Sequence, residues 1–171
     1  WTKRINTFET RREYLFAEPY IGSAMRKVET MDHAEAADLV MLSGFTGDEN
    51  FIDPICGSGT ILIEACMIAC KIPANINRKY FAFERWSDYD EDLYFIIQDA
   101  LLKKITNSHF KIMGFDKAPS AISKAKQNII NANLEEFIGV HHVNFFNSVK
   151  EVFGKTTLLL NPPYGERLTI D

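Results

Sequence analysis

The chain has 171 residues, of which 46% are hydrophobic and 25% are charged. This composition is typical of one globular domain and excludes an intrinsically disordered chain. The net charge of -4 argues against a strong nucleic-acid-binding surface on this chain alone. The longest apolar run, residues 61–70, contains Glu64 and is too short to cross a bilayer. The N-terminus also lacks the pattern of a signal peptide, so we expect a cytoplasmic protein without membrane contact.

Residues 1–31 have the weakest helix or strand pattern in the chain, and we interpret them as a connector or an N-terminal extension. From residue 32 onward, helix and strand patterns alternate. The expected helices cover residues 32–44, 59–73, 90–105 and 118–133, and the expected strands cover residues 50–54, 110–116, 139–146 and 156–161. This alternation predicts an α/β fold with a parallel, doubly wound sheet, and right-handed crossovers give the strand order 3-2-1-4.

The first expected helix has Asp32 as its N-cap, Glu35 to complete a capping box and Gly44 to end it. The second is apolar nearly all round and stops at Pro73, so we expect it to be buried against the sheet. The third carries an apolar stripe, and the fourth has Pro119 in its first turn and a stripe of its own. These stripes consist of Leu93, Ile96, Ile97, Ala100 and Leu101, and of Ala121, Ile122, Ala125 and Ile129.

Polar residues stand at the ends of the four expected strands, namely Asp53, Asp116, Asn144 and Asn161. In sheets of this kind, ligands bind beyond the carboxyl ends of the strands, where the winding reverses. If the fourth strand pairs with the free side of the first, the segments "DPICGSGT" and "NPPY" become neighbours there. We therefore expect one cleft shared by two motifs that lie far apart in the sequence.

The segment "DPICGSGT" places Gly57 and Gly59 between a strand and a helix, where they allow a tight turn and a close backbone approach. The helix that begins near Thr60 presents unpaired backbone donors to a ligand. Leu62 stands where a dinucleotide-binding Gly-x-Gly-x-x-Gly would have its last glycine, and the chain has no Gly-Lys-Ser/Thr. Neither a dinucleotide site nor a phosphate loop therefore fits.

Two carboxylates indicate which ligand the cleft would accept. Asp53 would repel pyrophosphate but attract a cationic amine, and Asp116 could hold a ribose diol through paired hydrogen bonds. S-adenosylmethionine has an ammonium group, a ribose and no phosphate, so it matches both carboxylates and the glycine turn. The alternative is that both aspartates are simple caps or turn residues.

The segment "TTLLLNPPYGER" joins three leucines that suit a buried strand to Asn161, Pro162, Pro163 and Tyr164. An exocyclic amine on a nucleobase is a poor nucleophile because its lone pair is delocalised into the ring. The side-chain oxygen of Asn161 and the carbonyl of Pro162 would accept its N–H bonds and favour the pyramidal form that develops during methyl transfer. The prolines stiffen the turn, and Tyr164 can stack on a base that has swung out of its helix. The alternative is an ordinary turn with a tyrosine covering the core.

We expect no metal site. Cys66 and Cys70 lie four residues apart without a further Cys/His pair, so we interpret them as reduced core residues. His141 and His142 are adjacent in a strand and would face opposite sides. Cys56 has no evident partner base, which favours packing near the ligand over a nucleophilic role.

Together, "DPICGSGT" and "NPPYGERL" resemble the class I methyltransferases that act on RNA, in particular the bacterial 23S ribosomal RNA guanine-N2 methyltransferases of the RlmL type. The segment "CKIPANINRKYFAFERW" is similar to that family's insertion, so the likeness covers residues 44–168. The resemblance implies a Rossmann-like sheet, S-adenosylmethionine as methyl donor and S-adenosylhomocysteine as product. It implies cofactor contacts from Asp53, Pro54, Cys56, Gly57, Ser58, Gly59, Thr60, Asp116, Lys117, Asn144, Phe145 and Asn161. It also implies that the guanine amine is received by the catalytic segment Asn161, Pro162, Pro163 and Tyr164.

Three features depart from that family, and the first is that the stretch before His33 does not match its usual sequence signals well. The family usually has an aspartate where Asn144 stands, so the contact to the adenine amine would carry no charge. Its members continue with three more strands and carry an RNA-binding THUMP domain ahead of this region. We therefore interpret residues 32–171 as an S-adenosylmethionine-binding methyltransferase domain that is cut short after its fourth strand. An RNA-binding domain outside the chain would also account for the negative charge of a protein that acts on RNA.

The sequence thus predicts methyl transfer from S-adenosylmethionine to the 2-amino group of a guanine in 23S ribosomal RNA. Because "NPPY" suits several amines, methylation of adenine N6 in DNA or of guanine N2 in tRNA remains an alternative. A non-catalytic cofactor-binding or RNA-docking fragment is the alternative from another class. The sequence does not indicate the oligomeric state.

Overall fold

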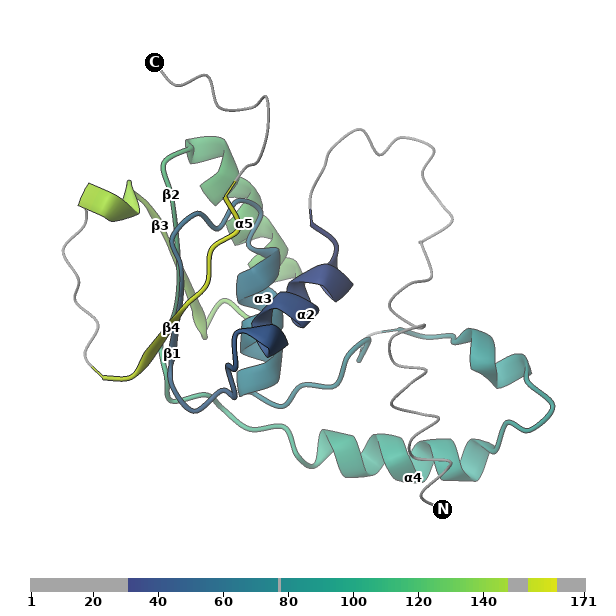
Figure 1. Ribbon diagram of the computed structural model, residues 1–171. Coiled ribbons are helices and arrows are strands. Elements are labelled where there is room, and N and C mark those ends of the chain that lie inside the picture. Colours follow the sequence, from purple (N-terminus) through teal and green to yellow (C-terminus); the bar gives the residue numbers. More distant parts are fainter. Residues whose placement is uncertain (1–30, 77, 148–153, 163–171) are drawn as a thin grey trace.

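Four parallel strands form the centre of the computed structural model, which describes residues 31–76, 78–147 and 154–162 (Figure 1). They are β1 (Asn50–Asp53), β2 (Ile112–Asp116), β3 (Ile138–His142) and β4 (Thr156–Leu158). Their order is β3-β2-β1-β4, which confirms the predicted order 3-2-1-4 and the predicted α/β class. All four residues of β1 are buried, because this strand has a neighbour on each side and helices above it.

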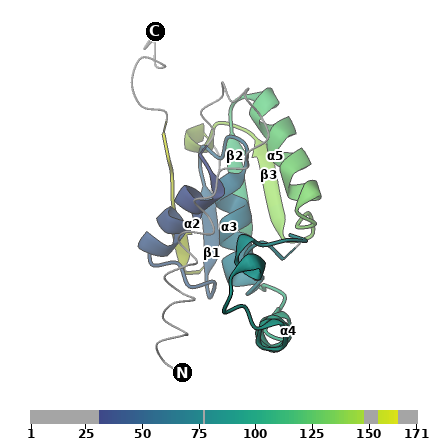
Figure 2. The ribbon, with the colours of Figure 1, turned by 90° about the vertical axis from the view of Figure 1, so that its right-hand side faces the viewer.

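Three helices cover one face of this sheet, as the two views together show (Figures 1 and 2). They are α2 (His33–Leu42), α3 (Thr60–Ala69) and α5 (Pro119–Asn131). The short turn η2 (Phe145–Asn147) follows β3 and lies on the other side of the sheet (Figure 1). The strand order places the reversal of winding between β1 and β4.

Local sequence signals set where these helices begin. Asp32 caps α2, and its carboxylate accepts the backbone N–H of Glu35 at 2.8 Å. Pro119 occupies the first turn of α5, where a missing N–H costs nothing. The predicted stripe of α5 is confirmed, since Ile122, Ala125 and Ile129 are buried.

Helix α3 ends at Ala69 rather than continuing to Pro73 as predicted. Lys71 adopts a left-handed φ of 55°, and its N–H donates to the carbonyl of Ile68. The N–H of Ile72 donates to the carbonyl of Met67 at 2.8 Å. These two bonds form a Schellman motif, which satisfies the last carbonyls and ends the helix before the proline is reached.

Helix α4 (Glu91–Leu102) differs most from the prediction, because none of its residues is buried. Phe95 is 54% exposed and Ile96, from the predicted stripe, is 65% exposed. The helix lies beyond the end of the sheet, after the short turn η1 (Ala82–Arg85) (Figures 1 and 2). In the connection from β1 to β2, α3 is the helix that packs on the sheet.

Two strands are shorter than predicted. Strand β3 ends at His142 instead of residue 146, and Val143 follows with its N–H donated to the carbonyl of Asp116 at 3.1 Å. Strand β4 ends at Leu158 instead of residue 161. Leu158 and Leu160 are 45% and 42% exposed, so the leucines that suited a buried strand lie at the edge of the described sheet.

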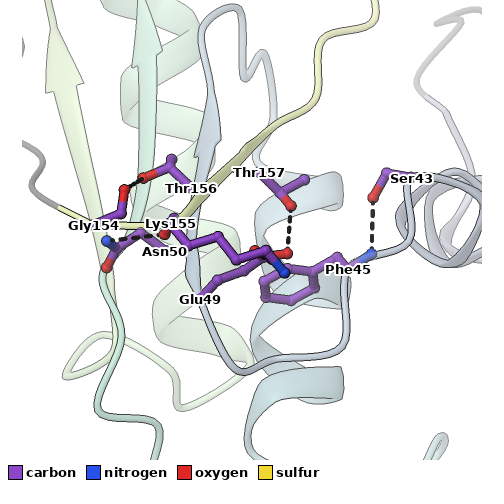
Figure 3. A network of polar contacts seen from close by, with 8 residues as sticks. All are labelled: Ser43, Phe45, Glu49, Asn50, Gly154, Lys155, Thr156 and Thr157. Carbon is purple, nitrogen blue, oxygen red and sulfur yellow. Dashed lines mark hydrogen bonds and ion pairs between the residues drawn. The ribbon is translucent and has the colours of Figure 1, made fainter.

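A polar network fixes β4 to β1 at the start of both strands (Figure 3). The carboxylate of Glu49 accepts the hydroxyl of Thr157 at 2.7 Å and pairs with the ammonium of Lys155 at 2.8 Å. The Lys155 ammonium, followed by the Thr157 hydroxyl, lowers the pKa of this carboxyl group. The side chain of Asn50 accepts the N–H of Lys111 at 2.9 Å and lies 3.4 Å from the Lys155 carbonyl. This network sets the register of a strand that has only three residues.

Candidate active site

Strand β4 brings two distant motifs to the same edge of the sheet. It runs parallel to β1 with Leu158 opposite Ile52, and the N–H of Leu159 donates to the carbonyl of Ile52 at 3.0 Å. Asp53 directly follows Ile52, and Asn161 lies two residues beyond Leu159. Both therefore leave the sheet at its carboxyl edge, as the strand order predicted. Asn161 is exposed and Pro162 is half-buried, whereas Pro163 and Tyr164 lie outside the described residues.

The segment after β1, residues 54–59, forms a tight turn that we call the glycine loop. It is held against β2, since the N–H of Cys56 donates to the carbonyl of Phe115 at 2.9 Å. Gly59 then caps α3 with a left-handed φ of 81°, and its N–H donates to the carbonyl of Cys56 at 2.8 Å. A Cβ atom on Gly59 would lie 3.2 Å from the Cβ of Ala125 in α5. The left-handed φ therefore favours glycine here, and any larger residue would also require Ala125 to shift by a few tenths of an ångström.

Asp53 is the most deeply buried of the predicted site residues, with 1% of its surface exposed. Its carboxylate accepts the N–H of Ile55 at 3.0 Å. Burial raises the pKa of Asp53 to about 7, an effect that the Ile55 hydrogen bond opposes and the negative charge of Asp116 increases. A cation placed beside this carboxylate, such as the ammonium group predicted to bind there, would favour its ionised form.

Asp116 uses both carboxylate oxygens to join two loops. One oxygen accepts the N–H of Gly57 at 3.1 Å, and the other accepts the N–H of Ala118 at 2.8 Å. The sequence predicted a ribose-binding role for Asp116 but not this bracing of the glycine loop. An ionised carboxylate has about four acceptor positions, so these two bonds leave acceptors for a diol.

Aromatic rings lie beyond the ends of β2 and β3. The ring of Phe115 contacts that of His141 in a stacked arrangement and that of Phe145 edge-on, each with centroids 5.3 Å apart. Asn144, the other residue predicted to border an adenine, is exposed just before Phe145. Phe115 was not predicted as a site residue, and His141 was considered only as a metal ligand; their paired register places them on the same side of the sheet.

Lys117, also a predicted cofactor residue, is exposed at the start of the turn into α5. Its carbonyl lies 3.1 Å from Nε2 of His142. His142 thus contacts the turn after β2, while His141 stacks on Phe115. The two neighbouring histidines have different partners, as expected for adjacent positions in a strand.

The cysteines are buried and reduced, as predicted. Burial, together with the charges of Asp53 and Asp116, raises the pKa of Cys56 to about 12, so its thiol stays protonated and is a poor nucleophile. The sulfurs of Cys66 and Cys70 lie 4.0 Å apart inside the core. In the described part of the chain, no group of three or more His, Cys, Asp or Glu side chains could hold a metal ion.

One contact to the glycine loop was not expected from the sequence. The side-chain amide of Asn128 in α5 donates to the carbonyl of Ser58 at 3.0 Å. The hydroxyls of Ser58 and Thr60 lie 3.1 Å apart at the start of α3. Asn128 belongs to the polar side of an amphipathic helix. From sequence alone, a polar side chain in that position is expected to face solvent, so this contact could not be predicted.

Proteins of known sequence resemble this chain along most of its length. It is 37% identical over 140 residues to the "Ribosomal RNA large subunit methyltransferase K/L" of Colwellia psychrerythraea, covering 78% of this chain and 19% of that protein. It is 35% identical over 145 residues to the protein of the same name from Buchnera aphidicola subsp. Schizaphis graminum, covering 77% and 20%. The chain therefore spans about a fifth of the length of these curated relatives.

Solved structures share the fold. One is SMU.472, a candidate methyltransferase in complex with SAH, which has a TM-score of 0.72 and 32% identity over 85% of this chain and 38% of the other. Another, from Listeria monocytogenes, is described as a predicted N6-adenine-specific DNA methylase, with a TM-score of 0.70 and 30% identity over the same shares. Helices in the described part of this chain lack the length and hydropathy needed to span a bilayer. The sheet order, these neighbours and a family match over residues 26–170 agree, and the chain belongs to the UPF0020 family, whose description is "RMKL-like, methyltransferase domain".

Proposed function

We propose that this chain binds S-adenosylmethionine and takes part in transferring its methyl group to the 2-amino group of a guanine in 23S ribosomal RNA. The observation that carries the proposal is the parallel pairing of β1 with β4, which leads Asp53 and Asn161 out of the same edge of the sheet. A methyl donor held by the glycine loop and an amine held by the Asn-Pro-Pro turn would meet at this edge.

In the proposed cofactor site, Asp53 attracts the ammonium group of the donor, and the glycine loop lies against its methionine part. Asp116, with Lys117 beside it, holds the ribose through acceptors that its two backbone contacts leave free. The adenine lies near Asn144 and Phe145, next to the ring of Phe115. S-adenosylhomocysteine, the product, lacks the methyl group but keeps every group named here.

The proposed chemistry is a direct displacement. The amine nitrogen attacks the methyl carbon, the carbon–sulfur bond breaks with its electron pair going to sulfur, and the sulfonium becomes a neutral thioether. The nitrogen then loses one proton to water. Asn161 and the carbonyl of Pro162 accept the N–H bonds of the amine and stabilise its developing positive charge. Pro163 and Tyr164 complete the substrate side, with Tyr164 stacking on the base.

Two relatives support this assignment because they are named as ribosomal RNA large subunit methyltransferases, and one structural neighbour is in complex with SAH. Residues 32–171 would supply the cofactor-binding part, and residues 1–31 would connect it to the rest of a longer protein. RNA would be recognised mainly by a further domain, because the chain carries a net charge of -4.

The test is to incubate extracted ribosomal RNA with the protein and S-adenosylmethionine carrying a labelled methyl group. Digestion to nucleosides then identifies the product. Labelled N2-methylguanosine is the expected result. A label found only in N6-methyladenine would overturn the choice of guanine, and calorimetry without any heat from S-adenosylhomocysteine would overturn the cofactor assignment.

Methylation of adenine N6 is the second candidate, because the Listeria monocytogenes neighbour carries that description. The Asn-Pro-Pro turn would treat an adenine amine as it treats a guanine amine, since both present two N–H bonds to the same acceptors. Offering DNA, tRNA and ribosomal RNA in parallel reactions separates these substrates in the same nucleoside assay.

A further inference from the structure

We propose that Asn128 is a positioning residue for the glycine loop, and that it raises cofactor affinity without touching the cofactor. The identity of the cofactor rests on the proposed function, whereas the contacts of Asn128 come from the structure. Asn128 lies in α5, and its side-chain amide donates to the carbonyl of Ser58 across 70 positions of sequence at 3.0 Å. The contact joins the helix after β2 to the loop after β1.

The contact fixes both ends of one peptide group. The carbonyl of Ser58 is held by Asn128, and the N–H of the same peptide, on Gly59, donates to the carbonyl of Cys56 at 2.8 Å. A peptide group is planar, so two hydrogen bonds at opposite ends determine its orientation. The backbone donors on either side of it then point in a defined direction before any ligand arrives, which lowers the cost of binding.

Three consecutive loop residues lie against the unit formed by β2 and α5. Gly57 is held by the carboxylate of Asp116 and Ser58 by Asn128, and Gly59 lies next to Ala125, where an added Cβ would come within 3.2 Å of the Ala125 Cβ. Ala125 and Asn128 are three positions apart and thus lie on one side of the helix. Of the two hydrogen bonds to the loop, only that of Asn128 comes from an exposed side chain, so it can be removed without opening the core.

The same helix offers a matched control. Asn131 is also exposed, and its side-chain oxygen accepts the amide of Gln127 at 3.0 Å. This bond lies within α5 and does not reach the loop. Asn131→Ala therefore removes one exposed hydrogen bond of the same kind from the same helix, but leaves the Ser58 carbonyl held.

The experiment compares the full chain with Asn128→Ala, Asn128→Asp and Asn131→Ala. Calorimetry measures the Kd for S-adenosylhomocysteine, hydrogen exchange follows the backbone amides of the glycine loop, and thermal unfolding checks the fold. We expect Asn128→Ala to weaken binding by about three- to tenfold, as for the loss of one hydrogen bond, and to speed exchange in the loop. Asn128→Asp keeps the size of the side chain but replaces the donor by a carboxylate that repels the Ser58 carbonyl, so its loss of cofactor affinity should be larger.

Equal Kd and equal loop exchange in Asn128→Ala and Asn131→Ala would overturn the inference while leaving the proposed function intact. A wild-type chain that gives no heat would overturn the proposed function, and loop exchange alone would then decide whether Asn128 holds the loop. A parallel fall in Tm and affinity for both Asn128 variants would show a merely structural role and would also overturn the inference.

Discussion

The carboxylate of Asp116 accepts the backbone N–H of Gly57 at 3.1 Å, although 59 positions separate the two residues in sequence. This bond ties the end of β2 to the loop after β1. Asp116 is 92 % shielded from solvent, with 8% of its surface exposed. Because Asp116 holds both the loop after β1 and the turn after β2, perturbing either one should affect the other.

Asp53→Asn should change stability and binding in opposite directions. The folded pKa of about 7 lies above the ordinary value of 3.8, so the neutral form is favoured in the folded state. The stability that the neutral Asp53 carboxyl group contributes is therefore fully present below pH 3.8 and is lost as pH rises through about 7. An amide cannot ionise, so above that range the variant should gain up to about 4 kcal/mol of unfolding free energy, less the cost of its own buried NH₂ group.

The same substitution should weaken S-adenosylhomocysteine binding, because the ammonium group loses its charged partner. Urea unfolding at several pH values measures the first effect and calorimetry the second. The gain in stability should shrink as pH approaches 3.8. A stability difference between variant and wild type that does not change between pH 3.8 and about 7, or a variant that binds S-adenosylhomocysteine equally well, contradicts the role given to Asp53.

Asn161→Ala should abolish methyl transfer while leaving cofactor binding mostly intact. Asn161 is exposed at the end of the β4 segment, so the substitution removes an acceptor without opening the core. Single-turnover methylation measures the loss, which we expect to reach about a hundredfold or more for an interaction made mainly in the transition state. Calorimetry with S-adenosylhomocysteine serves as the control, and a variant with full activity would rule out the proposed role.

Gly59→Ala should destabilise the fold more than Gly57→Ala does. Both positions have a left-handed φ, of 81° and 54°, and alanine there costs about 1 kcal/mol. At Gly59 the new Cβ would also lie 3.2 Å from the Cβ of Ala125, whereas at Gly57 it would meet nothing within 4 Å. Crowding of this kind adds about 1–3 kcal/mol. Urea unfolding of the two variants measures the difference in their free energies of unfolding. Equal losses of stability would show that α5 shifts to make room for the new Cβ without an energetic cost.

His33→Ala should reduce stability in acid but not in alkali. Nδ1 of His33 lies 2.7 Å from the carboxylate of Glu64, and this hydrogen bond raises the pKa of His33 while burial opposes the rise. A raised folded pKa means that the pair stabilises the fold fully below pH 6.5 and loses this effect as pH rises through the folded value.

Because the His33 side chain is 58% exposed, the effect should be about 1 kcal/mol or less. Thermal unfolding over a range of pH measures it, and Glu64→Gln is the matched variant that keeps an acceptor but removes the charge. A loss of thermal stability in His33→Ala that does not vary with pH would show that His33 acts by packing alone.

The alternation of helices and strands from residue 32 onward was enough to predict the order of the four strands, because parallel strands need right-handed crossovers. The stripe of α5, the N-cap at Asp32 and the first-turn position of Pro119 were predictable for the same reason, since each depends on residues within about one or two turns. The two motifs also had to leave the same edge once β4 paired with β1.

The tertiary structure alone decided what those elements touch. The stripe of α4 has the period of a buried helix, yet none of its residues is buried, and α3 is the helix of that crossover that packs on the sheet. Asn128 has the position of a surface residue, yet it holds the glycine loop, and Asp116 braces the same loop. Periodicity records spacing along one element, whereas these contacts depend on distances between segments that are remote in sequence and are fixed only when the helices pack on the sheet.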